Sequence, residues 1–173
     1  MEQVILVDSN DNELGTMEKM EAHRKGVLHR AFSVLLFNSS GEMLIQKRAS
    51  SKYHSGGLWS NTCCSHPRPT ESMEDAVSRR LEEELGIVSN PTFAFKFEYK
   101  IQFSNNLIEH ELDHVYIGSF DGEPQINESE ISDWKFIDTN DLKNKVQSHP
   151  HEYSHWFKII LSRPEMLELT KTV

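Results

Sequence analysis

The sequence contains no long hydrophobic run, and this absence excludes an integral membrane protein built from helices. Within its 173 residues, no stretch approaches the roughly 20 apolar residues that a membrane-spanning helix requires. The first ten residues, MEQVILVDSN, have neither the basic region nor the long apolar core of a signal peptide. We therefore expect a protein with no membrane partner.

Cysteine is scarce, because Cys63 and Cys64 are the only two in the chain. Their shared peptide bond restricts the approach of the two sulfur atoms, and a disulfide normally separates its two Cα atoms by ~5.5 Å. A chain of this length does not need disulfides, since it can bury roughly 70% of its unfolded surface. These observations predict a reduced, cytoplasmic protein.

Positive charge is also in short supply. The chain carries 18 Lys and Arg against 27 Asp and Glu, which gives a net charge of −9. A nucleic-acid-binding surface needs a basic patch, so we expect no nucleic-acid partner, whereas the excess of carboxylates fits a protein that holds cations. Repeats, low-complexity tracts and Pro/Gly-rich linkers are missing as well, which predicts a single domain over residues 1–173.

Short strands and helices are interleaved along the chain. The predicted strands cover residues 2–8, a hairpin over 30–48, and a pair over 92–103 and 107–120. The predicted helices cover residues 16–26, 71–87, about 138–147 and about 153–161. Aromatic residues recur at every second position from Phe93 to Tyr99, which predicts that they share one face of a strand. Hairpins favour a mixed or antiparallel sheet flanked by helices, an α+β fold of the α/β/α sandwich type.

The central helix has the clearest pattern. Apolar residues recur every four positions from Met73 to Leu85, and this spacing predicts one apolar stripe facing a core. Ser72 is the expected N-cap, with Asp75 three residues later. Gly86 is a natural C-terminal stop, because glycine adopts the left-handed conformation that ends many helices.

Charged residues surround that apolar stripe in the segment RRLEEEL, residues 79–85. On spacing alone they form i,i+4 ion pairs on a solvated face, each worth about 0.3–0.5 kcal/mol. The wider segment, residues 65–87, resembles the signature of the Nudix superfamily, Gly-x5-Glu-x7-Arg-Glu-U-x-Glu-Glu-x-Gly-U, in which U is aliphatic. The matching residues are Glu71, Arg79, Leu81, Glu83, Glu84, Gly86 and Ile87.

Two positions depart from this signature. Ser65 replaces the leading glycine, and Arg80 replaces the Glu that helps to hold divalent metals in the pyrophosphate-cleaving members of the superfamily. A guanidinium has no acceptor atom with which to bind a metal, so Arg80 counts against ordinary Nudix hydrolysis. The resemblance implies a Nudix-like mixed β-sheet flanked by helices, with an N-terminal extension and a C-terminal helical segment.

The departures fit one branch of the superfamily. Over nearly its full length the chain is similar to the type I isopentenyl-diphosphate isomerase family, through the segments WSNTCCSHP, FEYK, EHE and YSHW. This resemblance implies interconversion of isopentenyl and dimethylallyl diphosphate through a tertiary carbocation, in isoprenoid biosynthesis. It implies that Cys64 is catalytic, whereas Cys63 stands where the family needs no thiol. From the residues alone, both cysteines are equally well explained as small buried hydrophobic side chains.

Glu109 and Glu111 in EHE face the same way if this segment is a strand, although alternating carboxylates usually mark a solvated face. The resemblance implies a metal site, whose mixed nitrogen and oxygen donors suit Zn or Mn. Its implied ligands are His23, His29, His66, Glu109 and Glu111. Glu111 then also serves as acid or base. A histidine taken singly is more often structural, so the metal prediction depends on five residues matching together.

Two aromatic residues belong to the same resemblance. Tyr99 lies ten residues before Glu109, and we expect its hydroxyl to orient Glu111 or to relay protons to it. Trp156 in YSHW is expected to face the carbocation, which an indole stabilises by ~2 kcal/mol or more when water is excluded. Core packing is the competing explanation for both side chains.

The diphosphate of such a substrate needs local positive charge in an acidic protein. The expected substrate-binding residues are Lys19, Arg48, Lys52, Arg79 and Arg80. A Mg²⁺ ion can bridge phosphate oxygens and one carboxylate, and the resemblance implies that Glu84 supplies that carboxylate, with the carbonyl of Cys64. The segment KRASSKYH is equally consistent with a solvated basic loop.

Three functions are consistent with these observations. The first is the isomerase, acting on a small-molecule diphosphate as a monomer or homodimer, and it explains Cys64, Arg80 and the five-residue ligand set together. The alternative is a Nudix pyrophosphohydrolase acting on a nucleoside diphosphate derivative, which the retained Glu83 and Glu84 favour. The third is a non-catalytic, zinc-stabilised binding module. The mixed His/Glu ligands count against it, because structural zinc sites are mostly Cys-rich and tetrahedral.

Overall fold

Strand β3, His29–Phe37, lies at the centre of the sheet. The computed structural model, which describes residues 1–169, pairs β3 in parallel with β8 along one edge over its whole length. Along its other edge β3 pairs antiparallel with β1, β6 and β4 in turn. A strand buried on both sides needs a nearly continuous apolar sequence, and HRAFSVLLF meets that requirement after its first two residues.

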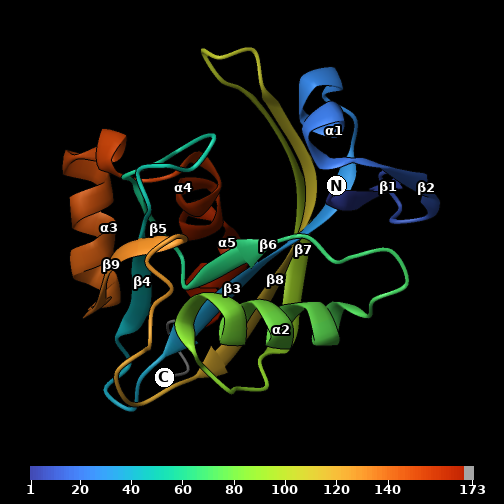
Figure 1. Cartoon of the computed structure of the whole chain (residues 1–173). Coiled ribbons are helices and arrows are strands. Elements are labelled where there is room, and N and C mark those ends of the chain that lie inside the picture. Colours follow the sequence, from blue (N-terminus) through green and yellow to red (C-terminus); the bar gives the residue numbers. More distant parts are fainter. Residues whose placement is uncertain (170–173) are drawn as a thin grey trace.

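Nine strands and five α-helices occur within residues 1–169 (Figure 1). The strands are β1 Gln3–Val7, β2 Glu13–Glu18, β3 His29–Phe37, β4 Met43–Arg48, β5 Trp59–Ser60, β6 Cys63–Ser65, β7 Thr92–Gln102, β8 Ile108–Ser119 and β9 Ile131–Ile137. The helices are α1 Lys19–Lys25, α2 Met73–Leu85, α3 Thr139–Ser148, α4 His155–Ser162 and α5 Pro164–Leu169, with a 3₁₀ turn at Pro150–Glu152. None of the helices in this described part is long and apolar enough to cross a membrane.

The two faces of the sheet carry separate cores. Alternation along β3 sends Phe32, Val34 and Leu36 toward α2, whereas Leu35 packs with α3, α4 and α5 on the opposite face. Figure 1 shows α2 on one side of the strands and the three C-terminal helices gathered on the other. This three-layer arrangement confirms the predicted mixed sheet flanked by helices.

Helix α2 follows the prediction closely. The Ser72 hydroxyl caps it by accepting a 3.1 Å hydrogen bond from the backbone N–H of Asp75. Val77, Leu81 and Leu85 are buried in the core beneath it. Gly86 ends the helix with a φ of 62°, the left-handed region that a side chain disfavours.

The strands differ from the sequence pattern at several points. Residues 16–18, expected in a helix, belong to β2, and β5 and β6 were not expected as strands. The pattern marked no strand at residues 131–137, yet β9 pairs along the length of β4, because the neighbouring strand supplies partners that a local sequence does not reveal. The register of β7 also shifts between Phe93 and Phe95, as at a β-bulge. The expectation that Phe93 shares a face with the other aromatic residues is therefore wrong: it contacts His114 and Tyr116, and it is half-exposed.

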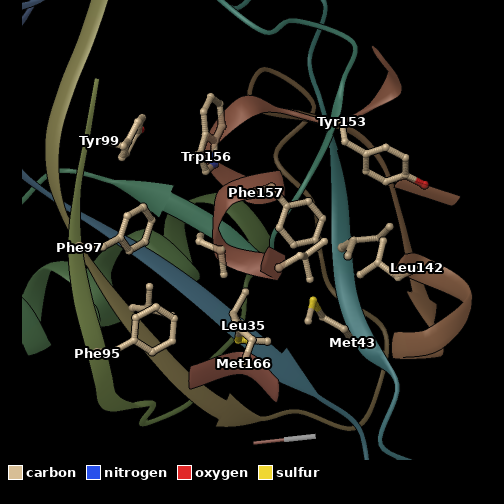
Figure 2. Close-up of a cluster of buried hydrophobic side chains, with 14 of the residues drawn as sticks. Leu35, Met43, Phe95, Phe97, Tyr99, Leu142, Tyr153, Trp156, Phe157 and Met166 are labelled. Carbon is tan, nitrogen blue, oxygen red and sulfur yellow. The ribbon is translucent and has the colours of Figure 1, made fainter. Parts of the chain in front are cut away.

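The remaining aromatic residues of β7 build the larger core. Figure 2 shows Phe95, Phe97 and Tyr99 in a column along β7, facing Trp156 and Phe157 of α4. Ile101 continues the column as a partly buried residue, and Tyr99 is the member that meets polar side chains, because its hydroxyl binds Glu111. The same face of β7 thus contributes both to the apolar core and, through Tyr99, to the polar cluster around Glu111.

A partly buried cluster of charged side chains fixes the N-terminal hairpin to this framework. Asp11, in the turn between β1 and β2, accepts hydrogen bonds from Arg30 (2.8 Å), Lys96 (3.0 Å) and His114 (2.8 Å). Burial alone would raise the pKa of Asp11, but these partners outweigh it and lower the pKa from 3.8 to about 2. Because α1 follows directly after β2, this anchor also determines where α1 lies.

We predict that Asp11→Asn destabilises the protein in a pH-dependent way. The depressed pKa means that the stabilisation is fully present above about pH 4 and disappears as the pH falls toward 2. At pH 7 the loss should be on the order of 1 kcal/mol, discounted for partial solvent exposure. Urea unfolding at several pH values measures it, with the exposed Glu123→Gln as the control. A difference from wild type that stays constant down to pH 2 would contradict the prediction.

Candidate active site and metal centre

Two carboxylates on β8 face the same side of the sheet, because side chains alternate along a strand. Glu109 and Glu111 are both buried. Strand β7 places Tyr99 directly opposite Glu111, and the Tyr99 hydroxyl donates a 2.6 Å hydrogen bond to Glu111 Oε2 and lies 3.3 Å from Glu109 Oε2. The structure thus brings Tyr99 to the carboxylate that it was expected to orient.

Three histidines converge on these carboxylates from separate parts of the chain. His23 lies in α1, His29 begins β3 opposite Glu111, and His66 follows β6. The Nδ1 atoms of His23 and His29 each face a backbone carbonyl oxygen, at 2.7 and 2.8 Å. A carbonyl only accepts, so each Nδ1 carries the hydrogen and each Nε2 keeps its lone pair free for a ligand.

The histidines meet at Glu111. Its Oε1 atom lies 2.9 Å from His66 Nε2 and 3.5 Å from His29 Nε2. Burial alone would raise the pKa of Glu111, but the contacts with His29 and His66 outweigh it and hold the pKa well below its usual value. Burial lowers the pKa of His23 and of His66 to about 4. Burial alone would lower the pKa of His29, but its contact with Glu111 outweighs burial and raises the pKa. Metal binding requires neutral imidazoles around the carboxylate, so a bound ion takes the place of any proton on His29.

This group of side chains fits a divalent metal ion. Single donor atoms from His23, His29, His66 and Glu111 all lie within 4.8 Å of one another. The Nε2 atoms of His23 and His29 are buried without a hydrogen-bond partner, which costs roughly 1–3 kcal/mol for each such group. Bound metal would remove that cost. Mixed nitrogen and oxygen donors suit Zn or Mn, and the identity of the ion stays a prediction.

Glu109 does not join those four residues. Its Oε1 atom lies 2.9 Å from His54 Nε2, and His23, His54 and Glu109 form a second group of donor atoms within 4.8 Å of one another. The expected five-residue ligand set is therefore divided into two groups that share His23. Sequence analysis missed His54, because its segment was interpreted only as a source of positive charge; the one available signal was an imidazole two residues after Lys52.

The adjacent cysteines point to opposite faces of β6. Cys63 is fully buried in the core beneath α2, as its interpretation as a buried hydrophobic residue requires. Cys64 lies opposite Ser33 of β3 and lines a cavity. Burial raises the pKa of the Cys64 thiol to about 12, against the opposing effect of Arg48, whose Nη1 atom is 3.7 Å from Sγ. The thiol therefore keeps its proton at neutral pH.

The cavity has a volume of about 50 Å³. Its wall includes the predicted residues Cys64, His66, Tyr99, Glu109, Glu111 and Trp156. It also includes residues that sequence analysis did not single out, namely Phe32, Ser33, Tyr53, His54 and Ser65. Sequence patterns gave no signal for Phe32, Ser33 or Tyr53, because their elements meet only in the folded chain.

Trp156 belongs both to the core and to the cavity wall. The side chain is buried in the larger core, and its indole N–H donates a 3.0 Å hydrogen bond to Asn61 Oδ1. The guanidinium of Arg48 lies 5.1 Å from the centre of the indole ring. A cation already lies against this indole, so the ring is placed to interact with positive charge.

Positive charge gathers on the same cavity. Lys19, Arg48, Lys52 and Arg80 all line it. Arg79 does not, because its Nε and Nη2 atoms bind Glu71 at 2.6 and 2.9 Å. Successive helical positions point about 100° apart. Arg79 therefore secures the loop before α2, while Arg80 faces the cavity.

Glu84 lies buried beside Arg80, with which it forms an ion pair. The Gln46 amide also donates a 3.3 Å hydrogen bond to Glu84, and Arg80 binds Glu83 at 2.9 Å. Arg80 thus forms ion pairs with both Glu83 and Glu84, the two adjacent carboxylates that match the Nudix signature. Glu84 is not part of either histidine group, so its role with Mg²⁺ stays a prediction.

Comparison with known proteins assigns a family to this arrangement. Residues 27–157 match the NUDIX domain family. The chain is 51% identical over 162 residues to isopentenyl-diphosphate Delta-isomerase 2 of Aromatoleum aromaticum, covering 94% of this chain and 86% of the relative. It is 48% identical over 161 residues to the isopentenyl-diphosphate Delta-isomerase of Pectobacterium atrosepticum, covering 93% and 90%. These relatives extend the match to the N-terminal segment that carries Lys19 and His23.

Solved structures agree on the fold. DR0079 from Deinococcus radiodurans aligns with a TM-score of 0.72 at 21% identity, covering 86% of this chain and 90% of that one. A MutT NUDIX hydrolase from Burkholderia pseudomallei aligns with a TM-score of 0.63 at 24% identity, covering 79% and 98%. At this level of identity the likeness concerns the fold alone.

We predict that Zn²⁺ or Mn²⁺ stabilises chelator-treated protein through the Glu111 cluster. At a hundredfold excess over Kd, one bound ion contributes about 2.7 kcal/mol to the free energy of unfolding, which thermal melting detects. Glu111→Gln should weaken metal binding at least about tenfold. Glu98→Gln is the matched control, because Glu98 makes a similar 2.9 Å contact with His110 away from the cavity. Equal metal responses in the two variants would refute the site.

Proposed function

The chain belongs to the isopentenyl-diphosphate Delta-isomerases of the NUDIX family, and we propose that it interconverts isopentenyl and dimethylallyl diphosphate with Cys64 and Glu111 as the proton-transferring pair. The reaction moves a double bond by adding a proton at one carbon and removing a proton from another. An unactivated alkene is a weak base, so the site must supply a positioned acid, a positioned base and protection for the carbocation between the two steps.

The observation that carries this proposal is the placement of Cys64 and Glu111. They come from β6 and β8, which flank β3 on opposite edges, and both line the same cavity. The thiol keeps its proton because burial raises its pKa to about 12, whereas Glu111 is ionised. A hydrocarbon between them has a proton donor on one side and an acceptor on the other.

Neighbouring groups support the two steps. The 2.6 Å hydrogen bond from Tyr99 orients the Glu111 carboxylate and can pass a proton to it. The Trp156 indole lies on the cavity wall, where its π face stabilises a carbocation by ~2 kcal/mol or more in the absence of water. The apolar core behind Trp156 limits the access of water, which would otherwise capture the cation as an alcohol.

Lys19, Arg48, Lys52 and Arg80 form the binding site for the diphosphate. All four line the cavity, so a substrate with its hydrocarbon end between Cys64 and Glu111 presents its charged end to them. The histidine cluster would hold Zn or Mn, which would fix the position of the Glu111 carboxylate, and Glu84 would hold Mg²⁺, which would supply positive charge beside the diphosphate. The same proposal includes a cytoplasmic location and a place in isoprenoid biosynthesis.

The hydrolase alternative is not favoured. Arg80 occupies the position of a metal-binding Glu and pairs with both Glu83 and Glu84. The curated relatives over most of the chain are isomerases by name, which also argues against a non-catalytic zinc module.

We predict that the protein converts isopentenyl diphosphate to its allylic isomer in the presence of Mg²⁺ without releasing phosphate. Cys64→Ala and Glu111→Gln should each abolish turnover, because each removes one end of the proton transfer. Cys63→Ala is the matched control, since Cys63 points into the core beneath α2 and should leave the rate nearly unchanged. Product analysis by NMR and a phosphate assay provide the measurement. Phosphate release from a nucleoside diphosphate derivative, with no isomer formed, would overturn the proposal.

We also predict that the two neighbouring arginines differ in their effect on kinetics. Arg80→Gln should raise KM for isopentenyl diphosphate by about 10–100-fold, because a hydrogen bond to a charged group is worth about 1.5–3 kcal/mol. Arg79→Gln should leave KM within about threefold and lower the melting temperature instead, since Arg79 binds Glu71 and not the cavity. Steady-state kinetics and thermal melting of both variants test this, and a larger rise in KM for Arg79→Gln would contradict it.

A further inference from the structure

His54 lines the cavity and is buried, although most residues of the loop that carries it are partly or fully exposed. Its side chain is 4% exposed, and its ring stacks on Phe103 with centroids 5.0 Å apart and planes 8° apart. Trp156 and the same ring are nearly perpendicular, with centroids 5.7 Å apart. Two aromatic side chains therefore hold the imidazole plane in one orientation, with Nε2 directed at Glu109.

The backbone around His54 is fixed as well. The Arg48 guanidinium donates a 3.4 Å hydrogen bond to the His54 carbonyl oxygen. The amide of Asn105, at the tip of the β7–β8 hairpin, donates a 3.1 Å hydrogen bond to the Tyr53 carbonyl oxygen. The hairpin that carries Glu109 thus also ties down the loop that carries His54, so the 2.9 Å contact between the two side chains is supported from both sides.

The contact of His54 with Glu109 repeats the contact of His66 with Glu111. In each pair an imidazole Nε2 lies 2.9 Å from a carboxylate Oε1. In each imidazole the Nδ1 atom is buried without a hydrogen-bond partner. Two donors that bind one metal at about 2.1 Å in neighbouring positions lie roughly 3 Å apart, so both pairs have the separation of adjacent ligands.

His23 connects the two pairs. Its Nδ1 atom is occupied by a backbone carbonyl, so it has only Nε2 to offer, yet it belongs both to the group with Glu111 and to the group with Glu109. One nitrogen lone pair binds one ion. Two ions cannot both use it, so the two groups can bind metal together only through a single ion close to His23. Their donor atoms do not form one group within 4.8 Å, so His54 and Glu109 must move toward that ion when it binds.

We propose that His54 is a sixth protein ligand of the metal centre, alongside His23, His29, His66, Glu109 and Glu111. Four imidazole nitrogens and two carboxylate oxygens make a six-coordinate set, which suits an octahedral ion. The inference rests on the metal site of the proposed function, because it adds one residue to that site. It goes beyond that function by assigning His54, which the sequence analysis left without a role.

Metal affinity and ligand identity test this proposal directly. Zn²⁺ affinity is measured by competition with a chromophoric chelator for wild type, His54→Ala and His54→Gln. Both variants should lose at least tenfold, because a glutamine amide can donate a hydrogen bond to Glu109 but does not replace an imidazole ligand. His155→Ala is the matched control, since His155 contacts the same Phe103 ring at 5.9 Å but is exposed, and it should keep wild-type affinity.

A crystal structure of the wild-type protein loaded with Zn²⁺ gives the second readout. Anomalous scattering should place the ion about 2.0–2.1 Å from His54 Nε2. An ion more than 3 Å from that atom overturns the proposal, as does wild-type affinity in His54→Gln, because His54 would then only position Glu109 through a hydrogen bond. Failure of the wild type to bind Zn²⁺ overturns it too.

Isomerisation of isopentenyl diphosphate, measured on the same wild-type sample, separates this inference from the proposed function. Turnover together with a zinc ion that His54 does not contact leaves the isomerase in place and removes only the sixth ligand. A zinc ion bound by His54 in a protein without turnover supports the ligand and refutes the isomerase. Thermal melting of each variant in chelator confirms that the affinities compare folded proteins.

Discussion

The structure of this site depends on a carboxylate buried among imidazoles. Removing Glu111 from water is unfavourable unless hydrogen bonds or charges replace the lost solvent, and Tyr99, His29 and His66 supply that replacement. Each partner comes from a different strand or loop, so the solvation of one carboxylate requires the central strands to assemble in one register. A one-residue slip of β8 would send Glu111 to the opposite face and leave the histidines without it.

Strand β3 connects this site to the rest of the fold. It begins at His29 in the histidine cluster and passes Ser33 opposite Cys64. Because β6 and β8 lie on opposite edges of β3, Cys64 and Glu111 face one cavity from two directions. A reaction that adds and removes protons at different carbons needs a donor and an acceptor that are separated in this way.

Positive charge is concentrated locally in this acidic protein, because Lys19, Arg48, Lys52 and Arg80 all line the cavity. Arg80 replaces a carboxylate of the Nudix signature, pairs with Glu83 and Glu84, and faces the cavity. A helix that in hydrolases concentrates negative charge for metals therefore contributes positive charge here. The same substitution removes a metal-binding carboxylate and places a cation on the cavity wall, as the proposed binding of an intact diphosphate requires.

The sequence by itself predicted the α/β/α class and the boundaries and caps of α2, because local periodicity carries that information. Through a dense family motif it also singled out Cys64, Glu111 and three histidines as candidate site residues. Only the tertiary structure decided that Arg79 faces away from the cavity, that a bulge moves Phe93 to the other face, and that His54 meets Glu109. Strand β9 was likewise not predicted from the sequence, since its partner β4 lies more than 80 residues earlier. These features depend on pairing between distant segments, and no local pattern records which segments will meet.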